Sequence, residues 1–227
     1  METEKLITVK GRGNIRVVPD VTRVKIEIAS LFDSYQTAYK MASANLKDVG
    51  EVLTNCKLEK SMAKTISFNI EKRFRDVYKN DHCTGEQEFI GYCLQQTIKI
   101  DFGMDNVLLS RVIKGLGERL TDMEIRIEYT VKDPRPHQLK MIDRAVKDAT
   151  EKARIMAQAA GCTLGLVKSI NYYETEMHIY SWARSLHECS EAIGCTADSL
   201  DITPDDLCAG EDVTVTWYLS NGKHGEE

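Results

Sequence analysis

"AVKDATEKARIMAQAAGCTLG", residues 145–165, places an alanine at every fourth position of a helical pattern. Successive helical residues are about 100° apart, so four alanines at this spacing share one arc of about 120°. They are Ala145, Ala149, Ala153 and Ala157, and Ile142, Val146, Met156 and Ala160 fall on the same arc. The opposite side carries Lys147, Glu151, Arg154 and Gln158. Methyl groups supply no nucleophile, ligand or charge, but they let a helix approach its neighbour closely. We therefore expect this stripe to be core.

The ends of this long helix are marked by residues with special backbone properties. Pro134 and Pro136 fit only its first turn, and Gly161 fits its C-terminal cap. Two shorter helices are predicted upstream. The first runs roughly from Ser34, a suitable capping residue, to Cys56, and the second roughly from Asp105 to Arg119.

Strand-like segments surround these helices and alternate between apolar and polar residues. They are "VKIEIAS" (24–30), "TISFNIE" (65–71), "IKIDF" (98–102), "EIRIEYTV" (124–131) and "VTVTWYL" (213–219). Such alternation indicates one buried and one wet face, which is typical of antiparallel sheet. The opening "ITVKGRGNIRVV" (7–18) predicts a strand pair or one bent strand, with Gly11 and Gly13 at a bulge or turn. The expected fold class is α+β: an antiparallel sheet with three packed helices, the third long and alanine-rich.

We expect a single domain over residues 1–227, with irregular loops near residues 76–88 and 176–208. The first of these loops is predicted to be a polar hairpin connection. The second is long for a structureless segment, and such loops are often functional. Tyr180 and Trp182 lie in it, where they could form an aromatic contact surface or anchor the loop to the body.

Composition excludes several classes of function. The net charge of −5 argues against an electrostatic nucleic-acid binder, and no window is long and apolar enough for a membrane-spanning helix. No signal peptide is visible, which predicts a cytoplasmic protein, or a periplasmic one if a leader has been removed. Seven cysteines without a recognisable framework fit reduced thiols better than a disulfide scaffold.

No motif assigns a catalytic, cofactor-binding or metal-binding residue. The glycine pairs in "GRG" (11–13) and "KGLGER" (114–119) lack the spacing of a phosphate loop, and the second pair is expected to end its helix. Two loop groups could in principle bind a metal, although neither has the paired spacing typical of zinc sites. One group is His82, Cys83 and Cys93; the other is His178, His187, Cys189, Cys195 and Cys208. An exposed Cys189 or Cys195 could instead be redox-active, and no nucleophile elbow appears.

Four strings, in order, resemble the SIMPL-domain family. They are "ITVKGRGNIRVVPDVTRVKIEI" (7–28), "GYCLQQTIKID" (91–101), "AVKDATEKARIMAQAAGCTLGLVKSINYYE" (145–174) and "ITPDDLCAGEDVTVTWYL" (202–219). The resemblance implies an α+β fold and homo-oligomeric assembly. The family includes YggE-like proteins linked to oxidative-stress protection and periplasmic immunogenic proteins. Its biochemical activity is undefined, so the resemblance transfers no catalytic residues.

These observations together predict a non-enzymatic module that assembles with itself or binds a protein partner, linked through the resemblance to a stress response. No cofactor, nucleic acid or membrane span is expected. The alternative is a redox- or metal-responsive stress protein that uses loop cysteines and histidines. An enzyme with an unrecognised pocket is a third possibility, because convergent polar groups become visible only in three dimensions.

Overall fold

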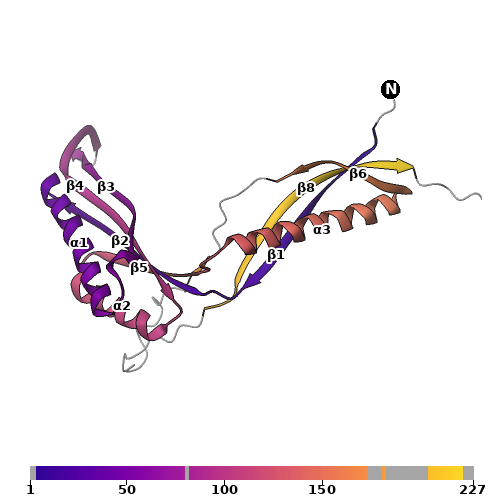
Figure 1. Cartoon of the computed structure of the whole chain (residues 1–227). Coiled ribbons are helices and arrows are strands. Elements are labelled where there is room, and N and C mark those ends of the chain that lie inside the picture. The colour runs from indigo at the N-terminus through magenta and orange to yellow at the C-terminus, as the bar shows by residue number, and fades with distance from the viewer. Residues whose placement is uncertain (1–3, 80–81, 173–179, 183–203, 222–227) are drawn as a thin grey trace, which may run out of the picture. The chain divides into compact units, whose positions relative to one another are not determined.

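The computed structural model describes residues 4–79, 82–172, 180–182 and 204–221, and the chain divides into two compact units (Figure 1). Unit 1 contains residues 1–18, 131–180 and 205–227, and unit 2 contains residues 19–130 and 181–204. The elements follow in the order β1 (Leu6–Val17), β2 (Val21–Phe32), α1 (Tyr35–Asn55), a 3₁₀ turn (Lys60–Met62), β3 (Ala63–Lys79), β4 (His82–Gly103), α2 (Asn106–Arg119), β5 (Met123–Thr130), α3 (Arg135–Ala159), β6 (Cys162–Asn171), β7 (Tyr180–Trp182) and β8 (Leu207–Asn221). The sequence predicted one domain over residues 1–227, and within that range the structure distinguishes these two units.

Unit 1 is a three-stranded antiparallel sheet in the order β1-β8-β6, with α3 lying along one face (Figure 1). Its core combines the helix alanines with Val9 of β1 and the alternating apolar residues of β8, which are Val213, Val215 and Trp217. The four alanines are at most 1% exposed, so the prediction that they form core is confirmed.

The buried stripe of α3 extends to Met141 and does not include every residue of the predicted arc. Met156 is 51% exposed and Ala160 is also exposed, so the prediction of burial for these two residues is wrong. A step of four residues advances about 40° around the helix, so the line of contact winds as it passes from Met141 to Ala157. This winding follows the twist of the long strands beneath the helix. In the last turn of α3 the line of contact no longer includes Met156, which faces outward.

Gly11 and Gly13 have a different role from the predicted one. β1 is one continuous strand whose pairing with β8 shows no register shift from Leu6 to Val17, so neither glycine forms a bulge. A Cβ atom at Gly11 would lie 2.0 Å from the carbonyl oxygen of Ala145, and one at Gly13 would lie 1.9 Å from that of Met141. The glycines therefore let the strand backbone contact the helix backbone, opposite the small residues of α3.

Unit 2 is an antiparallel sheet in the order β3-β4-β2-β5-β7, and its core lies between the sheet and α1 and α2. β2 alternates strictly between buried and half-buried residues from Val21 to Ile28, as its sequence predicts. Ser34 and Asp105 cap α1 and α2 by accepting hydrogen bonds from the backbone N–H groups of Thr37 and Leu108. The antiparallel α+β prediction is thus confirmed.

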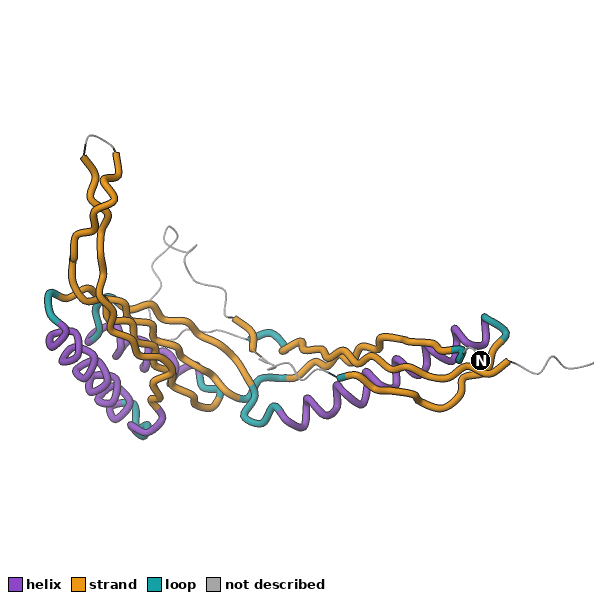
Figure 2. The backbone as a smooth tube through the Cα atoms, turned by 90° about the horizontal axis from the view of Figure 1, so that it is seen from above, coloured by secondary structure: helices purple, strands orange, loops and turns teal. Residues whose placement is uncertain are grey.

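The β3–β4 hairpin is longer than predicted and extends beyond the other strands of its sheet (Figure 2). The pairing of β2 with β4 ends at Phe32 and Tyr92, whereas β3 and β4 remain paired from there to Lys79 and His82. Most of the loop predicted near residues 76–88 is therefore strand. The loop predicted near 176–208 lies largely outside the described residues; strands β7 and β8 begin within its limits.

Candidate functional site

The projecting part of the hairpin, residues 73–91, carries a row of aromatic rings, and we call this segment the arm. Phe74 and Phe89 meet edge to face with ring centroids 5.7 Å apart, and Phe89 meets Tyr92 at 5.3 Å. Tyr92 in turn meets Tyr35, the first residue of α1, at 6.0 Å. This aromatic row of four rings runs from the start of α1 out along the arm.

The local sequence explains where the arm begins. Gly91 has a φ of 141°, and a Cβ atom there would lie 2.6 Å from the carbonyl oxygen of Phe32. Only glycine tolerates both the backbone conformation and this close approach. β4 therefore passes the end of β2 at Gly91 and continues paired with β3 alone.

The aromatic row begins at α1, where Tyr92 packs against Ala38 and Ala42, and three of its four rings are exposed. Tyr35, Phe74 and Phe89 are 51%, 48% and 45% exposed. Phe68, earlier on the edge strand β3, is similarly open at 46%. Contiguous exposed apolar surface is uncommon in monomeric proteins and marks sites of contact. Aromatic side chains are also enriched at protein interfaces.

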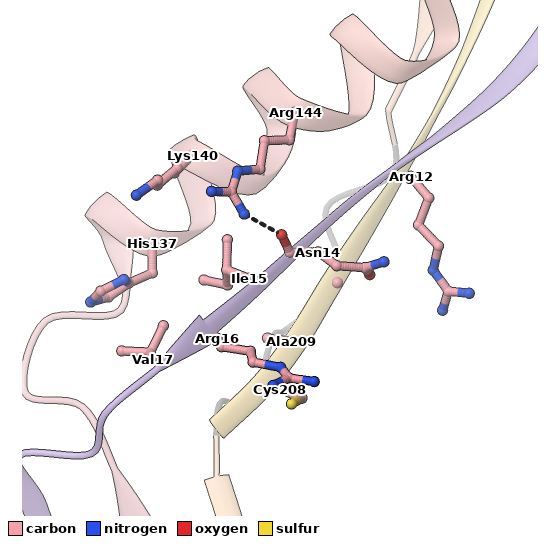
Figure 3. Close-up of a pocket in the computed structure, with 11 residues that line it drawn as sticks. Arg12, Asn14, Ile15, Arg16, Val17, His137, Lys140, Arg144, Cys208 and Ala209 are labelled. Carbon is pink, nitrogen blue, oxygen red and sulfur yellow. Dashed lines mark hydrogen bonds between the residues drawn. The ribbon is translucent and has the colours of Figure 1, made fainter. Parts of the chain in front are cut away.

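Unit 1 contains a groove of about 830 Å³ around the end of β1, which we call the basic groove (Figure 3). Its lining includes four cationic side chains and one imidazole: Arg12 and Arg16 of β1, and His137, Lys140 and Arg144 of α3. Cys208, Ala209 and Gly210 of β8 contribute to the lining, and none of the described lining residues is acidic. Arg144 donates a hydrogen bond of 2.6 Å to the carbonyl oxygen of Asn14. The sequence did not predict this groove, because its charged residues come from two segments that lie more than 120 positions apart.

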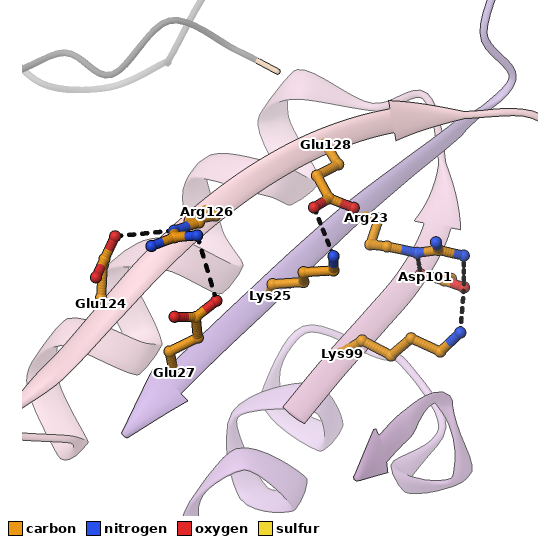
Figure 4. A network of polar contacts seen from close by, with 8 residues as sticks. All are labelled: Arg23, Lys25, Glu27, Lys99, Asp101, Glu124, Arg126 and Glu128. Carbon is orange, nitrogen blue, oxygen red and sulfur yellow. Dashed lines mark hydrogen bonds and ion pairs between the residues drawn. The ribbon is translucent and has the colours of Figure 1, made fainter. Parts of the chain in front are cut away.

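Unit 2 also has a network of ion pairs on the sheet face opposite its core (Figure 4). Arg23 donates two hydrogen bonds, of 2.7 and 2.9 Å, to the carboxylate of Asp101. Lys25 lies 2.6 Å from Glu128, whose side chain is 1% exposed. Arg126 pairs with Glu124 and Glu27 at 2.9 and 3.6 Å. Each cation faces an anion, so the network stabilises the sheet and leaves no charge for a ligand.

Asp101 shows the electrostatic effect of this network. Burial by itself would raise the pKa of its carboxyl group. The hydrogen bonds and positive charge of Arg23, with smaller contributions from Lys99 and Lys64, outweigh burial and lower that pKa below its ordinary value. The carboxylate is therefore held in its charged form, as a structural ion pair requires.

The predicted metal groups are only partly within the described residues. His178, His187, Cys189 and Cys195 lie outside them, as do the side chains of His82 and Cys83. Cys93 is half-buried on β4 and Cys208 is exposed on β8. Among the described residues, no three His, Cys, Asp or Glu side chains are grouped so that they could hold a metal ion.

The glycine pair of residues 114–119 and the two aromatic residues of the long loop lie within helices and strands. Gly115 and Gly117 lie within the last turns of α2, which continues to Arg119, and a Cβ at Gly115 would lie 2.9 Å from Val52 of α1. Tyr180 and Trp182 form β7, but their side chains lie outside the described ones. In the described part of the chain, no helix combines the length and apolarity needed to cross a bilayer.

The comparison with protein families gives one match. The family model described as SIMPL, a protein of unknown function (DUF541), matches residues 7–217. The match includes segments of both units. No curated protein matches the sequence.

Proposed function

Because the chain belongs to the SIMPL family, whose function is not known, we propose from its surface that it is a non-enzymatic module that assembles with itself through the arm. The aromatic row carries this proposal. Phe74 and Phe89 on the two-stranded projection, and Tyr35 at the start of α1, are about half exposed. Buried against a second surface, they would remove a contiguous apolar area from water.

The chemistry of the row suits an interface. Aromatic side chains dominate the binding energy of many interfaces because each buries a large area with few rotatable bonds. The rings already support one another edge to face, at 5.3 to 6.0 Å, so little side-chain freedom remains to be lost on binding. β3 is also an edge strand of its sheet, and edge strands can pair with another chain.

The test is the assembly state of the purified protein, measured by size-exclusion chromatography with light scattering over a range of concentrations. We expect the wild type to form a dimer or larger assembly. The double variant Phe74→Ser/Phe89→Ser removes two exposed rings and should weaken association by at least about 30-fold. Circular dichroism checks that this variant remains folded.

The matched control is Val107→Ser. Val107 is an apolar residue of α2 in the same unit, and it is 57% exposed but lies outside the arm. We expect this variant to assemble as the wild type does. A wild type that stays monomeric at high concentration, or an arm variant that assembles normally, would contradict self-assembly through the arm. If the wild type is monomeric, the test passes to binding of a protein partner. Partner capture by the wild type would then be compared with capture by the arm variant.

A redox-responsive stress protein is the second candidate, and one observation favours it. Cys208 is exposed on β8, and accessibility is a requirement for a reactive thiol. Thiol titration with peptide mapping would show whether Cys208 reacts faster than the half-buried Cys93 and Cys162, and metal analysis of the purified protein would test the metal-responsive form. Uniformly slow thiols and no stoichiometric metal would reject this candidate.

A further inference from the structure

We propose that the basic groove of unit 1 binds a small soluble anion that carries several linked phosphate groups. The inference concerns unit 1 and does not depend on assembly through the arm. It rests on the charge of the groove, on the spacing of its cations and on the free backbone edge of β1.

The groove holds more positive charge than its neighbourhood neutralises. Arg12 is compensated in part, because its Nε lies 3.6 Å from Asp212, which also pairs with Lys10 at 2.8 Å. Arg16 and Lys140, in contrast, make no ion pair with any residue in the described part of the chain. The whole chain has a net charge of −5, so a groove of this sign is a local feature.

Three acidic residues near the groove, Asp143, Asp148 and Glu211, already have partners. Asp148 accepts hydrogen bonds of 2.7 Å from both Lys152 and the backbone N–H of Arg12, and these bonds lower its pKa. Asp143 pairs with Lys147, one turn along α3, at 2.7 Å. The buried Glu211 has its own interactions within the fold. A bound anion would therefore supply the counter-charge that these groups do not give to Arg16 and Lys140.

The cations form two rows, one on each side of β1 (Figure 3). Arg12 and Arg16 are four residues apart on a strand, which separates their Cα atoms by about 13 Å. His137, Lys140 and Arg144 lie at intervals of three and four residues along α3, over about 10 Å. Rows of this length suit a chain of phosphates better than a single phosphate ion.

The strand edge between the two rows adds backbone donors. The backbone N–H of Leu219 donates a hydrogen bond to the carbonyl oxygen of Lys5, so these two residues form a hydrogen-bonded pair. In an antiparallel ladder such pairs recur at every second residue, and the register of β1 with β8 is unshifted. The odd-numbered residues of β1 therefore form their backbone hydrogen bonds with β8. The even-numbered residues therefore direct their N–H and C=O groups to the free edge. The carboxylate of Asp148 accepts a hydrogen bond from the N–H of Arg12. The next two N–H groups directed to the free edge, those of Asn14 and Arg16, lie along the groove. Backbone N–H groups and guanidinium groups are both effective donors to phosphate oxygens.

The lining also selects against larger nucleic-acid ligands. Proteins that hold single-stranded nucleic acid stack its bases on aromatic side chains, and the described residues of the lining include no phenylalanine, tyrosine or tryptophan. A volume of about 830 Å³ is within the range of sites for small molecules. The groove therefore fits a compact polyphosphate group.

Isothermal titration calorimetry with sodium tripolyphosphate on the full chain tests the proposal. We expect saturable binding that weakens as salt is raised, and a loss of at least about tenfold in affinity in Arg16→Gln/Lys140→Gln. The control Lys40→Gln/Lys47→Gln removes the same charge at two exposed residues of α1, in unit 2, and should bind within about twofold of the wild type. No binding by the wild type, or an equal loss in both variants, would overturn the proposal.

Cys208 provides a second readout that locates the ligand. It lines the groove and is exposed, whereas Cys162 is half-buried and is not a lining residue. Tripolyphosphate should slow labelling of Cys208 by an uncharged thiol reagent, with Cys162 labelled at an unchanged rate, as measured by peptide mapping. Unchanged labelling of Cys208 at saturating tripolyphosphate would place the ligand elsewhere.

Three further ligands test the chemical class. Inorganic phosphate should bind at least about tenfold more weakly than tripolyphosphate, since it spans fewer cations. Equal affinity for the two would overturn the requirement for linked phosphates. Tighter binding of a single-stranded oligonucleotide, or of vesicles bearing a bisphosphorylated lipid headgroup, with tripolyphosphate unable to compete, would overturn the assignment to a small soluble anion.

Discussion

Glycine and alanine determine how closely α3 packs against β1. Gly11 and Gly13 put the backbone of β1 against the backbone of α3, and the methyl groups of α3 fill the remaining space. A side chain on either strand residue would occupy the position of a helix carbonyl group. This close packing holds Asp148 and Arg144 at the free edge of β1, where they bind the N–H of Arg12 and the carbonyl oxygen of Asn14.

Gly11→Ala should therefore destabilise the protein strongly. The new Cβ would lie 2.0 Å from the carbonyl oxygen of Ala145, so the helix must move away, at a cost of about 3 kcal/mol in the free energy of unfolding. Gly117→Ala is the matched control: apart from the adjacent backbone of α2, no atom of the described residues lies within 4 Å of its Cβ position, and alanine should stabilise the helix by about 1 kcal/mol. Urea denaturation measures both. A Gly11→Ala protein as stable as the wild type would contradict the backbone contact.

Tyr129→Phe should raise stability. Tyr129 is 1% exposed, its hydroxyl has no hydrogen-bond partner among the described residues, and burial raises its pKa. Removing a buried hydroxyl that lacks a partner should increase the free energy of unfolding by about 1 kcal/mol. Tyr218→Phe, at a partly exposed residue of β8, should change it little. A marked loss of stability in Tyr129→Phe would show that the hydroxyl has a partner.

At the scale of elements, one face of each sheet is covered by helices and the other is polar. In unit 2 the polar face is stabilised by paired charges, chiefly the double hydrogen bond between Arg23 and Asp101. Alternation along the strands predicted this two-faced sheet. It did not predict which cation would meet which anion, since that depends on the register between strands.

Asp101→Asn should lower the free energy of unfolding by about 1 kcal/mol near neutral pH, a value reduced for the partial exposure of the pair. The pKa of Asp101 is lower in the folded protein than its ordinary value, so its carboxylate stabilises the fold above about pH 4. That contribution is lost as the pH falls through the lowered pKa, and the difference from the wild type should shrink there.

Urea denaturation at several pH values measures this effect. Asp143→Asn, which removes an exposed pair within α3, is the control and should change stability by less than about 0.5 kcal/mol. A constant difference between wild type and Asp101→Asn down to strongly acid pH would show that the charge of Asp101 is not what stabilises the sheet.

At the scale of the whole molecule, each unit has a core of its own among the described residues. The core of unit 1 lies between α3 and the β1–β8 pair, and the main core of unit 2 lies between its sheet and both α1 and α2. The two clusters share no residue. The two proposed surfaces also belong to different units: the arm to unit 2 and the basic groove to unit 1.

Separate cores predict separate responses to a local substitution. In Gly11→Ala, hydrogen exchange should accelerate at the amides of α3 and β8, because the packing of unit 1 is weakened. Amides of β2 and β4 should keep the protection that they have in the wild type. An equal loss of protection in both sets of strands would show that the chain unfolds as one cooperative unit.

The sequence by itself determined the local features of the fold. Ser34 and Asp105 begin helices because each caps the residues that follow it, and alternation in β2 separates a buried face from a polar one over eight residues. The alanine stripe indicated close packing of α3 because its period is a property of that helix alone. Each of these features depends on residues within a few turns or a single strand.

Tertiary structure alone decided the partners of these elements and the surfaces that they build. The contact of Arg12 with Asp148 joins residues 136 positions apart, and no local period encodes it. Gly11 has the same sequence signature whether it forms a bulge or faces a helix; only the position of α3 distinguishes the two. The basic groove and the aromatic row likewise exist because distant strands and helices end beside one another, and such proximity is set by how cores pack rather than by neighbours along the chain.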